Sequence, residues 1–218
     1  MMRFAERLAD AFAQGEVLST LRPEDRPADA DAAAAIQQDM LDTLGFVACG
    51  VRVARAVDGR WIAGPLLEGR IARDGATLPA SLFHAPRVSA GILLQAGRDI
   101  ADAADLPRAL STVRPLLDIA SSRYASGPPD AMWQAADLAG LGMITAGKPR
   151  RATRAALRAA ASGHDLERLL HCAMTTAGFL PAGALIAIAT LSDPFPPEPA
   201  ETLTAEIPGV GQTHITVA

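Results

Sequence analysis

The residue types that most often carry out chemistry in proteins are few and scattered in this chain. The histidines and cysteines are His84, His164, His171, His214, Cys49 and Cys172. Two histidines on one helix face usually hold a metal ion at a spacing of four, whereas His164 and His171 lie seven positions apart. The sequence has no Gly-x-Gly-x-x-Gly, phosphate-loop, Gly-x-Ser-x-Gly or His-Glu-x-x-His motif. These residues therefore predict no self-sufficient catalytic or metal centre.

The basic residues point to no polyanion-binding surface. Lys148 is the only lysine among the 20 basic residues. A basic stripe at helical spacing, typical of a solvated helix face, consists of Arg150, Arg151, Arg154 and Arg158. The formal net charge is −4, and phosphate binding depends on concentrated lysine and arginine. We therefore predict no nucleic-acid partner and assign the stripe no site.

The composition predicts a folded chain without a membrane segment. Its 218 residues are 50% hydrophobic and 20% charged, which suits one large domain or a small pair. Charged residues at the N-terminus, including Arg3, Glu6 and Arg7, exclude the apolar core of a signal peptide. The uncharged stretch 172–192 contains Pro181 and two glycines, unlike a spanning helix. These features predict a cytoplasmic protein with no membrane partner and two free thiols.

The elements that would position a site are expected to be helices first and mostly strands afterwards. Helices are expected over 2–14, 31–44, 130–138 and, after a break at Ser162-Gly163, 165–177. Strands are expected over 47–53, 87–95, 113–120, 140–146, 184–190, 202–207 and 213–217. The helical periodicity is clearest before Gly45, with Asp31 as the expected cap of the second helix. Asp58-Gly59 and Asp74-Gly75 predict hairpin turns, and the element order favours an α+β arrangement over alternating βαβ units.

Several short segments, taken in order, resemble one known family. They are Ala35-Ile36-Gln37, Pro86-Arg87-Val88, Gly97-Arg98-Asp99, 115–123, Ala136-Asp137, 180–183, Glu201-Thr202 and Gly209-Val-Gly211. In this order and spacing the chain resembles the 2-keto-4-pentenoate hydratase branch of the fumarylacetoacetate hydrolase superfamily. The resemblance covers about residues 4–217, and it depends on order and spacing rather than on any one motif.

The resemblance implies a fold, a cofactor and a chemistry. The fold is α+β: a mixed β-roll with N-terminal helices, here a helical segment 1–46 packed on the core and a catalytic-type roll 47–218. The cofactor is Mg²⁺ or Mn²⁺ held by three carboxylates, which chelates the carboxylate and 2-oxo oxygens of a small oxo acid and stabilises enolate-like charge. Hydratases of the family then add water to a 2-hydroxydienoate, and related decarboxylases release carbon dioxide. Family members usually form homo-oligomers.

The sequence departs from the family pattern at the residues that carry this chemistry. The family's Glu-x-Glu after Pro-Arg-Val reads Ser89-Ala90-Gly91, so two of three metal carboxylates are replaced. The third aligns with Asp118. The family's lysine aligns with Arg52, and an arginine does not serve as a base at ordinary pH. The family's Asp-Asn-x-Ser element aligns with residues 137–140, which read Asp-Leu-Ala-Gly. The acid is kept as Asp137, whereas the asparagine amide and the serine hydroxyl are lost.

Two interpretations of these residues stay open at this point. In the first, Asp118 binds metal and Asp137 assists catalysis, while Arg52 and Arg123 bind substrate, Arg52 as a bidentate clamp on a carboxylate. In the second, Asp118 is structural. The Asp118 carboxylate then accepts hydrogen bonds from Arg123 or from a neighbouring backbone amide. Alternatively, Arg52 pairs with Asp118 inside the vacated metal pocket, where the guanidinium replaces the charge of the cation.

Two functions correspond to these interpretations. One is a 2-keto-4-pentenoate hydratase-like or decarboxylase-type lyase that acts on or binds small 2-oxo acids, with Mg²⁺ or Mn²⁺ as the only candidate cofactor. The other is a non-catalytic relative that binds a small carboxylate or serves as a partner subunit. A single carboxylate among serine and glycine suits magnesium poorly, so the sequence favours loss of the usual metal centre.

Overall fold

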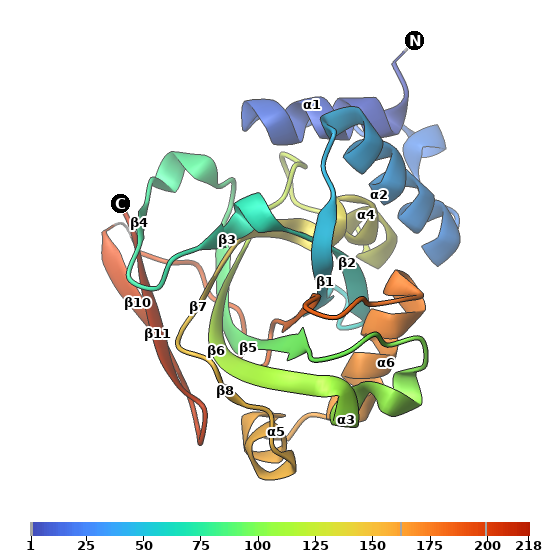
Figure 1. The fold of residues 1–218 in the computed structure, drawn as a ribbon. Coiled ribbons are helices and arrows are strands. Elements are labelled where there is room, and N and C mark those ends of the chain that lie inside the picture. The colour runs from blue at the N-terminus through green and yellow to red at the C-terminus, as the bar shows by residue number, and fades with distance from the viewer. Residues whose placement is uncertain (1, 162, 199) are drawn as a thin grey trace.

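The computed structural model describes residues 2–161, 163–198 and 200–218, which form a mixed α+β roll (Figure 1). The helices are α1 (Phe4–Gln14), α2 (Ala30–Leu44), α3 (Leu106–Ala109), α4 (Ala131–Ala136), α5 (Arg154–Ala161) and α6 (Leu166–Ala177). The strands are β1 (Ala48–Arg55), β2 (Trp61–Leu67), β3 (Ile71–Ala72), β4 (Thr77–Leu78), β5 (Arg87–Ala96), β6 (Leu110–Ala120), β7 (Leu141–Ala146), β8 (Arg150–Arg151), β9 (Leu185–Ile188), β10 (Glu201–Ile207) and β11 (Gly211–Val217). The predicted fold class is confirmed.

One curled sheet forms the wall of the roll. Its strand order is β2-β1-β9-β5-β6-β7-β3, and β8 pairs with the beginning of β6. β1 runs parallel to β9 and β3 runs parallel to β7, while the remaining pairs of this sheet are antiparallel. A second sheet, β10-β11-β4, packs its apolar side chains against those of β5 and β6. Strands far apart in the large sheet can therefore face one another across the roll.

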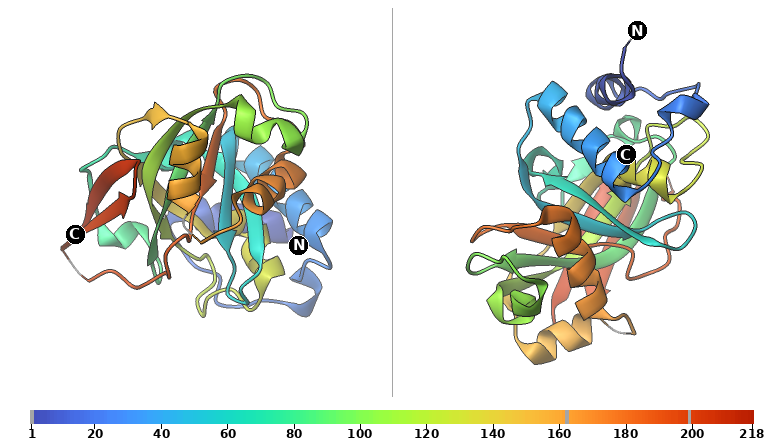
Figure 2. Two further views of the ribbon diagram at one scale, coloured as in Figure 1. Left: turned by 90° about the horizontal axis from the view of Figure 1, so that it is seen from below. Right: turned by 90° about the vertical axis from the view of Figure 1, so that its right-hand side faces the viewer.

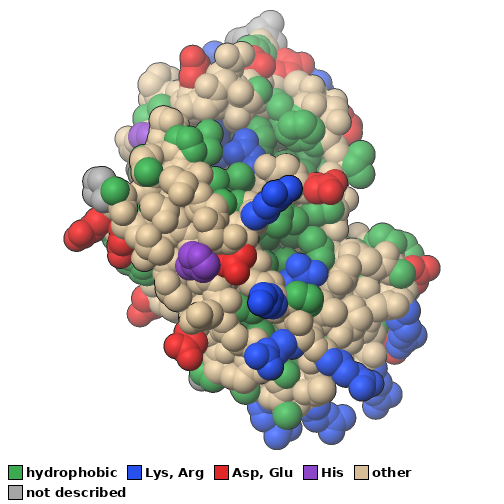
Figure 3. Space-filling model, turned by 60° about the vertical axis from the view of Figure 1, so that its left-hand side comes forward, with side chains coloured by type: hydrophobic (Ala, Val, Ile, Leu, Met, Phe, Trp, Pro, Cys, Tyr) green, Lys and Arg blue, Asp and Glu red, His purple; other side chains and the backbone are tan. Residues whose placement is uncertain are grey.

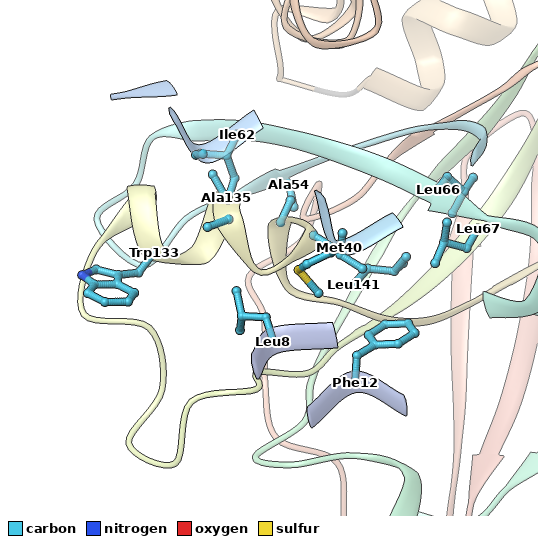
Figure 4. Close-up of a cluster of buried hydrophobic side chains, with 14 of the residues drawn as sticks. Leu8, Phe12, Met40, Ala54, Ile62, Leu66, Leu67, Trp133, Ala135 and Leu141 are labelled. Carbon is cyan, nitrogen blue, oxygen red and sulfur yellow. The ribbon is translucent and has the colours of Figure 1, made fainter. Parts of the chain in front are cut away.

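The first two helices close one end of the roll. Leu8 and Phe12 from α1 and Met40 from α2 join Trp133 of α4 in one apolar cluster (Figure 4). The right-hand view of Figure 2 shows these N-terminal helices (blue) at the opposite end from α5 (light orange). Burial of their apolar faces, more than helix propensity, accounts for the stability of such helices. The arrangement of a helical segment 1–46 and a roll 47–218 as a single structural unit stays a prediction.

The predicted helix ends are correct in part. Gly45 ends α2 in the left-handed conformation, with φ 66°, as its lack of a side chain allows. The cap of α2 is Asp29, whose carboxylate accepts from the amide of Ala32 at 2.8 Å, and the prediction of Asp31 was wrong. The break predicted before α6 is present between α5 and α6, although Ser162 lies outside the described residues. None of the helices described is long and apolar enough to cross a membrane.

Three other local predictions were wrong for identifiable reasons. Asp74-Gly75 does not join two paired strands, because β3 pairs with β7 and β4 with β11. Arg150 and Arg151 form strand β8 on β6, so the four-arginine stripe does not lie on one helix. These arginines are nevertheless exposed, as predicted, and basic side chains gather at the lower end of the face in Figure 3. The helix predicted over 130–138 ends at Ala136, because the next residues turn sharply.

Candidate functional site

Arg52 and Asp118 form a closed ion pair inside the roll. The Nε and Nη2 atoms of Arg52 each donate to a different carboxylate oxygen of Asp118, both at 2.6 Å. The Nη1 atom donates to the carbonyl oxygen of Ala139, also at 2.6 Å. Each of the two charged side chains is only 1% exposed. Arg52 and Asp118 therefore satisfy one another and the adjacent backbone, and neither side chain faces solvent.

The curl of the sheet is what brings the two residues together. Arg52 lies on β1 and Asp118 on β6, and β9 and β5 separate these strands in the sheet. In a flat sheet their side chains could not touch, because neighbouring strands lie about 4.8 Å apart. Gly64 of β2, the partner of Arg52 across the ladder, has no side chain to block the turn that carries Ala139. A Cβ atom there would lie 2.9 Å from the carbonyl carbon of Leu138.

The turn that accepts the third hydrogen bond of Arg52 is strained. Leu138, Ala139 and Gly140 all have positive φ, at 49°, 54° and 74°. The left-handed conformation costs roughly 1–2 kcal/mol for each residue that carries a Cβ atom. Leu138 and Ala139 are fully buried, so packing and the Arg52 hydrogen bond hold this conformation.

A second buried ion pair begins the same turn. The Nε atom of Arg123 donates to Oδ1 of Asp137, and the Arg123 amide donates to Oδ2 at 2.9 Å. The Nη1 atom of Arg123 donates to the carbonyl oxygen of Leu141 at 2.6 Å, and its Nη2 atom donates to the carbonyl oxygen of Asp137 at 2.7 Å. Burial raises the pKa of the Asp137 carboxyl, and Arg123 opposes that shift. Arg123 therefore pairs with Asp137, and the prediction that it satisfies Asp118 was wrong.

The residues aligned with the family's metal ligands do not fit a divalent cation. Both carboxylate oxygens of Asp118 already accept from Arg52. The hydroxyl oxygen of Ser89 accepts from the amide of Thr190 at 3.1 Å, and Gly91 offers no side chain. A Cβ atom at Gly91 would lie 2.2 Å from the carbonyl oxygen of Ile188, so no ligand fits there without moving β9. The described part of the chain contains no cluster of three His, Cys, Asp or Glu residues able to hold a metal ion.

The structure thus brings the four predicted site residues together as two pairs joined by one turn. The ion pair expected between Arg52 and Asp118 is present. The catalytic, metal-binding and substrate-binding roles of Arg52, Asp118, Arg123 and Asp137 stay predictions. Sequence reasoning missed Ala139, since only its backbone takes part and an alanine gives no signal of positive φ.

Of the cavities near these pairs, two of the larger ones do not reach Arg52 or Asp118. One, of about 310 Å³, is lined by residues that include Arg87, Ser121, Ser122, Gln134 and Asp137. The other, of about 480 Å³, lies between α2, β1, β2 and the segment before β9. The Arg52–Asp118 pair therefore lies outside the lining of both cavities, and a small molecule in either cavity would not touch this pair.

Comparison with known proteins identifies the fold. No family model and no curated protein matches the sequence. The 4-oxalocrotonate decarboxylase of Pseudomonas putida G7, complexed with magnesium and adipate, matches with a TM-score of 0.84 at 17% sequence identity, over 99% of this chain and 96% of that one. The same enzyme complexed with calcium and acetate gives a TM-score of 0.82 at 17% identity, with the same coverage.

A more distant solved structure extends the likeness beyond that enzyme. The 2-hydroxyhepta-2,4-diene-1,7-dioate isomerase of Mycobacterium marinum matches with a TM-score of 0.53 at 15% identity, over 79% of this chain and 75% of that one. At these identities the likeness shows the fold alone. The chain has the fold of the fumarylacetoacetate hydrolase superfamily, as expected, and the hydratase branch in particular stays a prediction.

Proposed function

We propose that this chain is a non-catalytic relative of the fumarylacetoacetate hydrolase superfamily that binds a small carboxylate. In this proposal the Arg52–Asp118 ion pair replaces the metal centre of the related enzymes. In this chain one guanidinium, with a single positive charge, faces one carboxylate. In the metal centre that the family resemblance implies, three carboxylates surround a doubly charged cation. The observation that carries the proposal is the bidentate contact between two side chains that are each 1% exposed.

The physical argument concerns competition for the Asp118 carboxylate. A metal ion would have to displace a guanidinium that makes two charge-assisted hydrogen bonds to it. The released guanidinium would then lie buried beside a cation, and an unpaired buried charge costs several kcal/mol. The described residues contain no group of three His, Cys, Asp or Glu side chains that could hold the cation in place of this ion pair. The ion pair therefore favours a protein that works without a metal.

The carboxylate-binding part of the proposal is supported by the solved relatives. The decarboxylase structures hold adipate and acetate in addition to their metal ions. This chain keeps their fold and has cavities beside its ion pairs. A small 2-oxo acid or related carboxylate is the ligand class that we propose. By analogy with the family we also expect a homo-oligomer.

The competing function is a metal-dependent lyase on 2-oxo acids. The likeness to a decarboxylase with bound magnesium favours it. Calorimetric titration of the chain with Mg²⁺ and Mn²⁺, with and without 2-oxopent-4-enoate, separates the two functions. We expect no saturable metal binding and no consumption of the oxo acid. Micromolar metal binding accompanied by turnover would refute the proposal and establish the lyase.

A further inference from the structure

Arg70 is a partly buried cation without a counter-ion among the described residues. It ends the 3-10 turn Glu68–Arg70 between β2 and β3, and its guanidinium carbon lies 4.0 Å from the centre of the Phe12 ring. Within the described residues, no carboxylate lies within 4.0 Å of its guanidinium nitrogens, and they donate no hydrogen bond. Burial, and then the nearby charge of Arg123, lower the pKa of Arg70. Its surroundings thus disfavour the positive charge that an anion would stabilise.

The neighbouring arginine is already neutralised. Arg123 lies 5.4 Å from the centre of the same Phe12 ring, but its guanidinium is paired with Asp137. Its hydrogen bonds to backbone carbonyls of Leu141 and Asp137 occupy its other nitrogens. The excess positive charge at this place therefore belongs to Arg70.

A small cavity lies beside Arg70 and is lined with hydrogen-bonding groups. Its volume is about 30 Å³, enough for one or two water-sized groups. Ser122 lines it, and since the Ser122 hydroxyl oxygen accepts from the amide of Tyr124 at 3.1 Å, its proton can be donated. His84 also lines it, with Nε2 3.0 Å from the carbonyl oxygen of Ala125. Glu16 is the one acidic residue in the lining, and it is exposed and beyond ion-pair distance.

We propose that this cavity binds the carboxylate group of a small anion, with Arg70 as the main ligand and the Ser122 hydroxyl as a second donor. The planar fork of a guanidinium matches a carboxylate in two parallel hydrogen bonds, and the Phe12 ring packs against the Arg70 guanidinium. The cavity admits a carboxylate group and little more, so the remainder of the ligand extends into solvent. This inference takes its ligand class from the proposed function and adds the residues that hold the ligand.

Titration of ¹⁵N-labelled protein with sodium acetate at constant ionic strength tests this site by NMR. We expect saturable shifts of the Arg70 Nε–H signal and of the backbone amides of Ser122 and Arg123. In Arg70→Gln the affinity should fall about tenfold or more, because a charged bidentate contact is lost. The acetate affinity of Arg70→Lys should lie between those of wild type and Arg70→Gln, because lysine keeps the positive charge but cannot make two parallel hydrogen bonds.

Arg73→Gln is the matched control. Arg73 lies three positions along the chain, is exposed and does not line the cavity. The substitution changes the net charge equally, so acetate affinity should stay within about twofold of wild type. If Arg70→Gln does not fold, Ser122→Ala provides the test through an expected loss of several-fold in affinity.

Two results would overturn the inference. Equal acetate affinity in wild type and in Arg70→Gln would place the carboxylate elsewhere and leave the proposed function standing. Absence of saturable binding by wild type would remove both the site and the carboxylate-binding part of the proposed function. Neither result depends on metal titration or on turnover.

Discussion

Arg52 is the residue on which the account of this protein depends most. A buried ion pair gains electrostatic attraction but loses the hydration of two charges, so its net contribution to stability can be small. The consequence of breaking it is larger, because one charge is left buried without a partner. The Arg52–Asp118 pair therefore acts as a structural unit, in which each residue requires the other.

Substitutions at the pair should reveal this coupling. Arg52→Met leaves the Asp118 carboxylate buried and unpaired, and should lower the free energy of unfolding by about 3–5 kcal/mol. The double variant Arg52→Met/Asp118→Leu should lose much less than the sum of the single variants. Urea unfolding monitored by circular dichroism measures these changes.

The control for these variants is Arg60→Gln, which breaks an exposed ion pair with Asp58. Surface pairs contribute little, so its unfolding midpoint should barely move. Additive effects of the two single substitutions would contradict the coupling of Arg52 and Asp118.

The two thiols should be slow to react at neutral pH. Burial raises the pKa of both Cys49 and Cys172 above the ordinary range of a thiol. The reactive species is the thiolate, so a raised pKa leaves less of it at pH 7, and its fraction grows only as pH rises further. Alkylation with iodoacetamide should be several-fold slower in folded protein than in protein unfolded by urea. Equal rates in the two states would contradict the burial of these thiols.

At the scale of elements, the sequence predicts what is periodic and misses what is set by tertiary contacts. The helical periodicity of α1 and α2 was sufficient to place those two helices. The turn at 138–140 was not predictable, because a leucine and an alanine adopt positive φ only when packing imposes it. Strand β8 was missed because two exposed arginines carry no strand signal, and its pairing with β6 depends on residues distant in sequence.

The candidate site was predictable only through resemblance. Order and spacing pointed to Arg52, Asp118, Arg123 and Asp137, although they lie on different segments. Which arginine pairs with which acid could not be derived from spacing, since the curl of the sheet decides it. Arg70 gave no signal in the sequence, because the feature that singles it out is the lack of a nearby carboxylate among the residues that the structure describes.

The close approach of β5 and β9 is testable with a glycine pair. A Cβ atom at Gly91 would lie 2.2 Å from the carbonyl oxygen of Ile188, whereas one at Gly69 would meet no atom within 4 Å. Gly91→Ala should therefore lower the free energy of unfolding by about 1–3 kcal/mol or more, through overpacking. Gly69→Ala should change it little. Thermal unfolding of the two variants makes the comparison, and similar melting temperatures would contradict the proximity of β9 to Gly91.

At the scale of the whole molecule, the fold is similar to that of the solved decarboxylase, and two buried ion pairs lie at its centre. Separate apolar clusters close the roll, with α1 and α2 packed at one end and α6 against β1 and β2. In the described residues, every buried polar side-chain atom has a hydrogen-bond partner. Retention of the fold alone says nothing about activity.

The expected homo-oligomer belongs to this scale. Phe46, Val47 and Phe179 are exposed apolar side chains that a partner copy would cover, and Phe179 also lines the cavity of about 480 Å³. Size-exclusion chromatography with light scattering should give a mass at least twice the 22.6 kDa of one chain. A mass of one chain over the micromolar range would contradict the expectation.

The central claim is that an arginine replaces the metal, and crystals soaked in Mn²⁺ test it most directly. We predict no anomalous difference density beside Asp118 and an Arg52–Asp118 contact unchanged from 2.6 Å. A manganese peak at about 2.2 Å from the Asp118 carboxylate, with Arg52 displaced, would contradict the account.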